Sequence, residues 1–140
     1  MFKLLASALV PGVCAIGLAA PAQADDSYIV IAGSDSTHAF EAATGGNLAT
    51  LSQVEGYAVS RCADRHGATD CRVLAEGQGG CVALSNSGQN LVGAWGATRS
   101  AAGAAAVAKV GSPGANVATA RCVGDLHLTP PGWNSFWVTQ

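Results

Sequence analysis

The sequence predicts an α+β domain of two tandem ββαβ halves, which form antiparallel sheet with two packed helices and are stapled by disulfides. Three observations predict it. An even number of cysteines follows an N-terminal export signal, two segments have the caps or composition of helices, and short apolar runs separated by turn residues flank each segment. The 140 residues are 49% hydrophobic and 11% charged, a composition that argues against intrinsic disorder.

Residues 1–24 have the features of a cleaved signal peptide. Lys3 is followed by a long apolar run, and a small-x-small site ends at Ala24, directly before the acidic Asp25. Pro11 interrupts the run, which argues against a retained membrane anchor. We therefore expect cleavage between Ala24 and Asp25, a secreted protein that is extracellular or associated with the cell envelope, and no membrane span after processing.

The processed chain is short enough for one domain. We expect that domain over residues 25–122, with halves at about 28–77 and 81–122, and an aromatic tail over 123–140. Without Lys3, six basic residues stand against nine acidic ones, which gives a net charge of −3. No basic stripe is present, so nucleic acid is not an expected partner. We expect a monomer whose partner, a protein or an envelope component, the sequence does not identify.

Four cysteines remain once Cys14 leaves with the signal peptide. An even count in an exported chain indicates two disulfides. A structural zinc site is the main alternative, but the tight C-x2-C spacing typical of such sites is absent, and a catalytic thiol would be expected to stand unpaired. Sequence alone allows three pairings. We favour Cys62–Cys71, which closes a short polar loop, and Cys81–Cys122, which ties the first strand of the second half to its last.

The first half begins with two apolar runs around a Gly-Ser-Asp-Ser turn, over residues 28–43, which predict two strands. Thr50 and Gln53 then form a capping box, and the next apolar residues share one helical face: Leu51, Val54, Ala58 and Cys62. Glu55 lies near that face. We favour a rim carboxylate that reaches outward over a buried acid paired with an arginine. The segment after Cys71 predicts a strand.

The second half repeats this order. Residues 81–95 hold two apolar runs around an Asn-Ser-Gly turn, and an alanine-rich helix is predicted to begin at Thr98, which aligns with Thr50 of the first half. Its charged ends and Gly103 argue against a membrane span. Side chains this small allow the helix backbone to lie close to a sheet. A last strand ends at Cys122, and residues 77–80, Gly-Gln-Gly-Gly, are interpreted as a flexible joint between the halves.

No catalytic signature is present, and neither G-x-S-x-G nor H-E-x-x-H occurs. The histidines His38, His66 and His127 fall in a presumed strand, a loop and the tail. Carboxylates such as Asp70 and Glu76 give no reason to be paired as glycosidase chemistry requires. We therefore assign no catalytic residue, no cofactor and no metal ligand. A hydrolase that uses His38, His127 and a carboxylate is the least favoured alternative.

Aromatic residues are concentrated in the tail, after two prolines that end regular structure. Three of them, with one tryptophan of the domain, define a candidate contact surface: Trp95, Trp133, Phe136 and Trp137. The tail either folds back over a sheet, as tryptophan more often does, or stands out as a contact patch. The leading interpretation is a non-enzymatic interaction module of the medium or envelope. The alternative is a small-ligand or glycan binder that stacks sugars on these rings.

The cysteine spacing and the block at residues 93–99 resemble the bacterial secreted proteins of domain-of-unknown-function family 4189. Glu55 lies where the family often has a glutamate. The other matching positions are Tyr28, Cys62, Cys71-Arg72-Val73, Cys81 to Leu84, Gly93, Trp95-Gly96, Thr98-Arg99 and Cys122. Gly103 departs from the family pattern, as does the chain after Cys122. The resemblance implies an exported, disulfide-bonded α+β domain and no established activity.

Overall fold

The computed structural model describes residues 27–46, 49–125 and 136–138. The first half contains β1 (Tyr28–Gly33), β2 (Phe40–Gly45), α1 (Leu51–His66) and β3 (Arg72–Gln78). The second half contains β4 (Cys81–Asn86), β5 (Leu91–Gly96), α2 (Arg99–Val110) and β6 (Val117–Cys122). A short 3-10 turn, η1 (Val123–Asp125), and strand β7 (Phe136–Val138) follow. The predicted α+β architecture of two ββαβ halves is confirmed.

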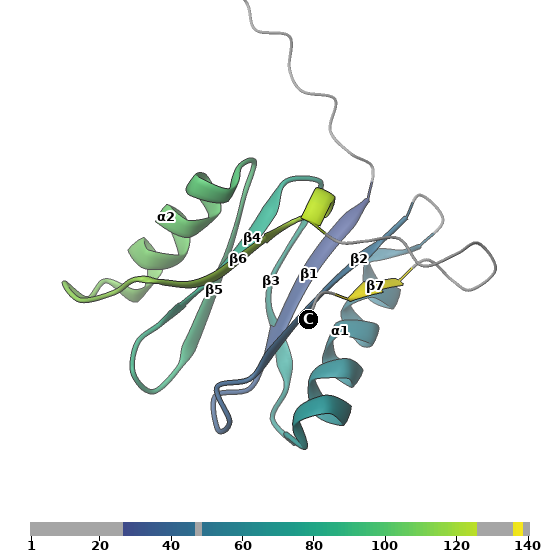
Figure 1. The fold of residues 1–140 in the computed structure, drawn as a ribbon, viewed down its shortest axis with the longest axis horizontal. Helices are drawn as coiled ribbons and strands as arrows, with labels where there is room; N and C mark the ends of the chain where they lie inside the picture. The colour runs from purple at the N-terminus through teal and green to yellow at the C-terminus, as the bar shows by residue number, and fades with distance from the viewer. Residues whose placement is uncertain (1–26, 47–48, 126–135, 139–140) are drawn as a thin grey trace, which may run out of the picture.

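The strands form two separate antiparallel sheets. Sheet A has the order β3-β1-β2-β7, and sheet B has the order β5-β4-β6. In each half, the first strand is central and the second and last strands flank it. Helix α1 packs on sheet A and α2 packs on sheet B, so the layers run α1, sheet A, sheet B, α2 (Figure 1).

The main core lies between the two sheets. Alternation along β1 turns Ile29 and Ile31 toward sheet B and Val30 and Ala32 toward α1. Because both faces of β1 are covered, its sequence is continuously apolar. The buried residues between the sheets are Ile29, Ile31, Ala42, Ala75, Val82, Leu84 and Leu91. Burial of each isoleucine or leucine stabilises the fold by about 1.5–3 kcal/mol.

The two helices begin as the sequence predicts. The Thr50 side chain accepts from the Gln53 amide, and the Gln53 side chain accepts from the Thr50 amide, which confirms the capping box. Thr98 caps α2 in the same way through the amide of Ala101. The face of α1 that is buried against sheet A consists of Val54, Ala58 and Cys62.

Helix α2 lies close to sheet B, as its small side chains predict. Ala102 and Ala106 are fully buried. A Cβ built on Gly96 of β5 would lie only 2.7 Å from the Ala101 carbonyl carbon and 2.8 Å from the Ala102 Cα. Within the described residues, neither helix has the length and hydropathy needed to cross a membrane.

Both predicted disulfides are present. Cys62–Cys71 joins α1 to the residue before β3, and Cys81–Cys122 joins β4 to β6 at directly paired positions. Because all four sulfurs are bonded in pairs, the zinc and free-thiol interpretations of these cysteines are wrong.

The joint between the halves is a tight turn and not the flexible linker expected. Gly77 and Gln78 belong to β3, and only Gly79 and Gly80 separate it from β4. Both have positive φ, 61° and 68°, which glycine adopts without strain. The Gly79 amide donates to the Ser27 carbonyl, and the Trp95 indole donates to the Gly79 carbonyl. These hydrogen bonds fix the turn that leads from sheet A to sheet B.

Candidate ligand-binding pocket

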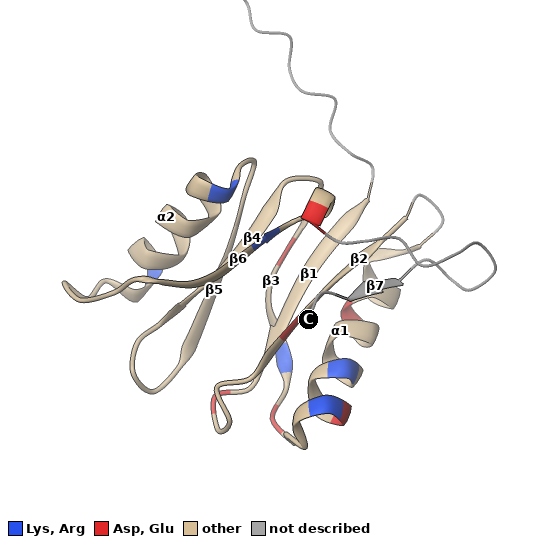
Figure 2. Cartoon of the chain, in the orientation of Figure 1, with Lys and Arg blue, Asp and Glu red and all other residues tan. Residues whose placement is uncertain are grey.

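Charged residues lie on both helices, in the turns and on a few strands (Figure 2). Glu41 of β2 differs from the other charged residues of the strands because it is only 5% exposed. A buried carboxyl group is costly unless its oxygens are paired. The surroundings of Glu41 therefore form a candidate site.

The end of α1 supplies partners for one oxygen of Glu41. Phe40 and Ala42 contact the core between the sheets, so alternation turns Glu41 toward α1. His66, in its Nε2-protonated form, donates to Glu41 Oε1 at 3.1 Å. The Arg65 guanidinium lies 3.4 Å from the same oxygen. Both basic residues lie in the last turn of α1, where the helix dipole favours positive charge.

The second oxygen of Glu41 has no such partner. Oε2 is buried and has no hydrogen-bond partner in the described part of the chain. Leaving a buried acceptor unpaired costs about 1–3 kcal/mol, and more for a charged group. This oxygen has almost no accessible surface, so protein atoms enclose it and leave the carboxyl group only partly compensated.

A cavity of about 500 Å³ adjoins this carboxyl group. It lies beside residues 40–42 of β2; among the described residues, β7 pairs with β2 at residues 43–45. The lining comes from three elements and the β1–β2 turn: Ala39, Phe40, Glu41, Ala42, Arg65, His66 and Arg121. The pocket thus combines an apolar wall, a buried carboxyl group and guanidinium groups from both halves.

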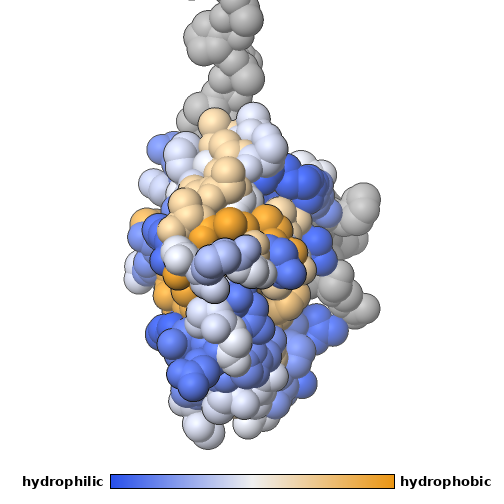
Figure 3. Space-filling model, turned by 90° about the vertical axis from the view of Figure 1, so that its left-hand side faces the viewer, coloured by the Kyte–Doolittle hydropathy of each residue, from blue (hydrophilic) through white to orange (hydrophobic). Residues whose placement is uncertain are grey.

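A second, shallower hollow lies between α2 and β6. Its lining is Thr98, Arg99, Ser100, Gly103, Ala104, Val117 and Ala120. Figure 3 views the face that carries α2 and shows apolar residues gathered in its middle, with polar residues around them. Among the described residues that line it, no buried side-chain polar atom lacks a partner. The β2 pocket is therefore the better candidate for specific recognition.

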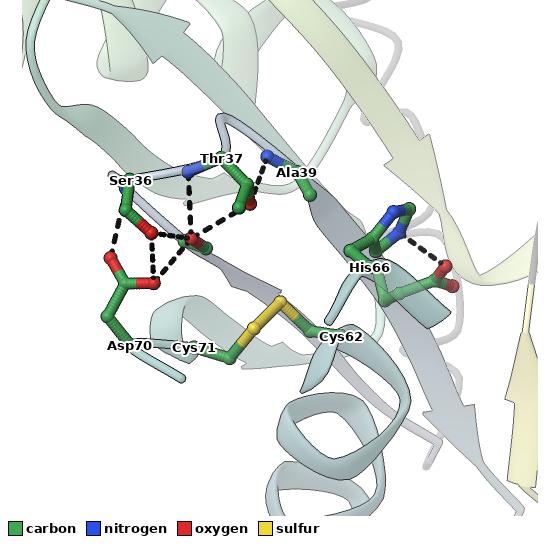
Figure 4. Close-up of a disulfide and its surroundings, with 9 residues drawn as sticks. Ser36, Thr37, Ala39, Cys62, His66, Asp70 and Cys71 are labelled. Carbon is green, nitrogen blue, oxygen red and sulfur yellow. Dashed lines mark hydrogen bonds and ion pairs between the residues drawn. A yellow bond between two sulfur atoms is a disulfide. The ribbon is translucent and has the colours of Figure 1, made fainter. Parts of the chain in front are cut away.

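A polar cluster of Ser34, Ser36, Thr37 and Asp70 lies beside the Cys62–Cys71 disulfide (Figure 4). The Asp70 carboxylate accepts from the hydroxyls of Ser34 (2.5 Å) and Ser36 (2.7 Å) and from the Ser36 amide (2.9 Å). These bonds, the one from Ser34 foremost, hold the pKa of Asp70 well below its ordinary value. The cluster is fully hydrogen-bonded and ties the β1–β2 turn to the start of β3, so we interpret it as structural.

Replacing Asp70 by asparagine is expected to lower the melting temperature at neutral pH, because the amide accepts fewer of these hydrogen bonds. A carboxyl group whose pKa is lowered in the folded state stabilises the fold above its ordinary pKa of about 3.9. This stabilisation is lost as the pH falls through the folded-state pKa. The difference from the native protein should therefore shrink in acid. Thermal unfolding monitored by circular dichroism between neutral pH and pH 3 tests this. Asp64→Asn is the control, since Asp64 accepts only one exposed bond from Ser60; an equal effect there contradicts the prediction.

Glu55 and Glu76 form a pair that the sequence analysis missed. Glu55 is half-buried on α1 and shares a hydrogen bond with the carboxyl group of Glu76 on β3. Its half-buried position agrees with the favoured interpretation of a rim carboxylate, and its described neighbour is a second carboxyl group and not an arginine. The shared hydrogen bond, with smaller effects of desolvation and of the Glu55 charge, raises the pKa of Glu76. Direct contact leaves no room between the carboxyls for the water or sugar of a glycosidase site.

Replacing Glu76 by glutamine is expected to stabilise the protein at neutral pH. A raised carboxyl pKa means that the fold is favoured most below about pH 4.3 and loses stability as pH rises through the raised value. Because Glu76 is exposed, solvent screening limits the gain to about 0.5 kcal/mol. Urea unfolding of Glu76→Gln, Glu55→Gln and the double variant measures it. The double variant should gain less than the two single gains added together; full additivity would mean that the carboxyls do not interact.

The structure describes only one of the two histidines of the hydrolase alternative, His38. His38 is exposed in the turn between β1 and β2, with a positive φ of 56°, and not in a strand. His66 is the last residue of α1 and not part of a loop. His127 lies outside the described residues, as do Trp133 and the expected cleavage site at Ala24 and Asp25.

The proposed aromatic surface is described only in part. Trp95 is 42% exposed on β5. Phe136 and Trp137 belong to β7, whose backbone pairs with β2 at Gly45 and Thr44.

The sequence analysis did not single out Glu41, Arg65 or Arg121. One signal was available: Glu41 is the only charged residue in an otherwise small and apolar run, from Ala39 to Ala43. Its partners could not be identified, because His66 lies 25 positions away and Arg121 belongs to the other half of the domain.

Comparison with known proteins gives one match. No curated protein and no solved structure matches the chain significantly. The family model for a domain of unknown function, DUF4189, matches residues 28–124, which is most of the chain and covers both halves and both disulfides. The chain therefore belongs to the DUF4189 family, as its cysteine spacing and the block at residues 93–99 suggested.

Proposed function

We propose that this protein is an exported, non-enzymatic binding module of the cell envelope or the medium, and that the β2 pocket is its binding site. The observation that carries the proposal is a cavity of about 500 Å³ whose lining joins an apolar wall to a carboxyl group that is only 5% exposed, Glu41, and to basic side chains from both halves of the domain. Two disulfides support export, since such bonds persist in oxidising compartments.

Two features of the pocket favour binding over covalent catalysis. Its described lining contains no hydroxyl or thiol nucleophile, and the imidazole Nε2 of His66 is directed at Glu41. A nucleophilic mechanism needs a serine, threonine or cysteine beside a base. What the lining does offer is a shaped apolar wall with a few polar groups, as small-ligand sites commonly do.

A ligand screen followed by NMR on the 15N-labelled mature protein tests this function. Fragments of envelope polymers and small metabolites that bind should shift the amides of Phe40 to Ala42, His66 and Arg121. Ala39→Trp should block binding by filling the pocket. The matched control, Ala104→Trp, fills the hollow on the α2 side and should leave binding unchanged. The proposal is contradicted if ligands bind the Ala39→Trp variant as well as the native protein, or if no compound shifts the amides at the pocket.

A glycan site at Trp95 is the second candidate, and one observation favours it. A Cβ on Gly77 would lie only 2.6 Å from the Trp95 Cγ, so the indole rests directly on this glycine. Its Nε1 donates to the Gly79 carbonyl at 2.9 Å, which fixes the ring while 42% of the residue stays exposed. A rigid, half-exposed ring is a suitable surface for stacking a sugar.

Fluorescence titration with glycan fragments distinguishes the tryptophans. A variant with Trp133→Phe and Trp137→Phe retains only Trp95, so its emission should change on binding, whereas Trp95→Phe alone, which keeps Trp133 and Trp137, should show no change. If no fragment changes the emission of the native protein, the glycan site is refuted and the β2 pocket is unaffected.

A further inference from the structure

The charges of the β2 pocket select a class of ligand, an inference that rests on the proposed function of this pocket as a binding site. Its described lining contains two arginines, Arg65 of α1 and Arg121 of β6, and one carboxyl group, that of Glu41. The chain as a whole has a net charge of −2. The charge of the pocket lining is therefore opposite in sign to that of the protein.

Asp125 lies near Arg121 but does not cancel this positive charge. Its carboxylate accepts two hydrogen bonds of 2.7 Å from the Arg99 guanidinium and one of 2.7 Å from the Cys122 amide. Together with the ion pair at Glu41, the described residues here contribute three guanidinium groups and two carboxylates. One positive charge remains uncompensated, even with the histidine of the pocket counted as neutral.

Arg121 has the donors and the access to bind an anion with this charge. In the described part of the chain, its Nη1 donates to the neighbouring Ala120 carbonyl at 3.3 Å. A guanidinium group has five N–H donors in a planar fork, and the fork matches the two oxygens of a carboxylate. The Arg121 side chain is half-buried, so part of it remains accessible from the pocket. Most of its donors are therefore available to a ligand.

The wall beside these charges is apolar. Ala39 and Phe40 line it and are both only half-buried, and Phe40 also packs on the core between the sheets, which holds its ring in place. The cavity of about 500 Å³ has the size of a small-molecule site. An inorganic ion would leave the wall in contact with water, so the lining favours an anion that also carries apolar groups.

We propose that the β2 pocket binds a monoanionic organic acid with an apolar body. The carboxylate of the ligand pairs with Arg121, and its hydrocarbon part packs on Phe40 and Ala39. One carboxylate matches the single uncompensated positive charge, whereas a phosphate dianion brings more negative charge than the pocket compensates, and an ammonium group is repelled.

Probes with the same eight-carbon chain test this assignment by NMR titration of the native mature protein. Octanoate should bind and shift the amides beside the pocket. Octanamide and octylammonium lack the negative charge, so each should bind at least about tenfold more weakly. Acetate has the carboxylate without the chain and should also bind at least about tenfold more weakly. Octyl phosphate, measured as the dianion at pH 8, should bind no more tightly than octanoate.

Variants with matched controls locate the contacts. Arg121→Gln should weaken octanoate binding by about tenfold or more and leave octanamide binding unchanged, because only the acid uses the charge. Arg72→Gln is the control, since Arg72 is exposed and pairs with Asp35 outside the pocket. Ala39→Trp should block octanoate, whereas Ala104→Trp fills the hollow beside α2 and should not. If Arg121→Gln does not fold, the comparison of octanoate with octanamide on the native protein decides the question.

The outcomes also separate this inference from the proposed function. The acid assignment is refuted if octanamide binds as tightly as octanoate, if Arg121→Gln binds octanoate unchanged, or if octanoate at millimolar concentration shifts no amide at the pocket. Tighter binding of octyl phosphate refutes the preference for a monoanion. If the wider screen still gives ligands that Ala39→Trp blocks, the pocket binds another class of ligand. If Ala39→Trp changes the binding of no compound, both proposals fail.

Discussion

Replacing Cys81 and Cys122 together by alanine is expected to lower the free energy of unfolding by about 4 kcal/mol. The disulfide joins residues 41 positions apart, and the loss of loop-closure entropy in the unfolded chain grows with the length of the closed loop. Cys62 and Cys71 are only 9 positions apart, so their replacement should cost about 3 kcal/mol. Since small domains have unfolding free energies of only 5–15 kcal/mol, either loss is severe.

Urea unfolding of the two double variants and the native protein, followed by circular dichroism, measures this difference. The order of the two stability losses is more informative than their sizes, because replacing either disulfide also removes packing at its site. Hydrogen exchange adds a spatial test: loss of Cys62–Cys71 should loosen the end of α1 and the segment before β3 while sheet B stays protected. A smaller loss for the Cys81 and Cys122 variant than for the other would contradict the entropic argument.

Those features of the fold that depend on local sequence could be predicted. The capping box needs only Thr50 and Gln53, and the end of α1 and the following strand bring Cys62 near Cys71. The pairing of Cys81 with Cys122 followed from assigning a strand to each. These predictions rest on residues whose positions are set by their own helix, strand or turn.

Local sequence was less reliable where one residue type allows two structures. Glycines at positions 79 and 80 suit both a flexible linker and a tight turn with positive φ. The deciding contacts, from Ser27 and Trp95 to Gly79, come from distant parts of the chain. The separation of the strands into two stacked sheets has the same origin, because it depends on which buried faces meet.

The candidate pocket could not be predicted, since it is assembled from both halves. Glu41 is positioned by β2, its basic partners by the end of α1, and Arg121 by β6. The Glu55 and Glu76 pair arises in the same way, from the packing of α1 on sheet A. Each group is unremarkable in sequence, and its chemistry depends on a tertiary contact.

Replacing Gly96 by alanine is expected to destabilise the protein by about 3 kcal/mol, because α2 leaves no space for a side chain there. The new Cβ would lie 2.7 Å from the Ala101 carbonyl carbon, 2.8 Å from the Ala102 Cα and closer still to the Ala102 nitrogen. All three are backbone atoms of the first turns of α2, so no side-chain rotation relieves the overlap. Helix and strand must move apart, which opens the contact between Ala102 and sheet B.

Gly56→Ala is the matched control, since a Cβ at this exposed position of α1 meets no atom within 4 Å. Alanine is the better helix former, so this variant should gain up to about 1 kcal/mol. The same chemical change is thus expected to act in opposite directions at the two positions, in a denaturant unfolding experiment on both variants. A Gly96→Ala protein as stable as the native one would mean that α2 does not lie as close to sheet B as its small residues allow.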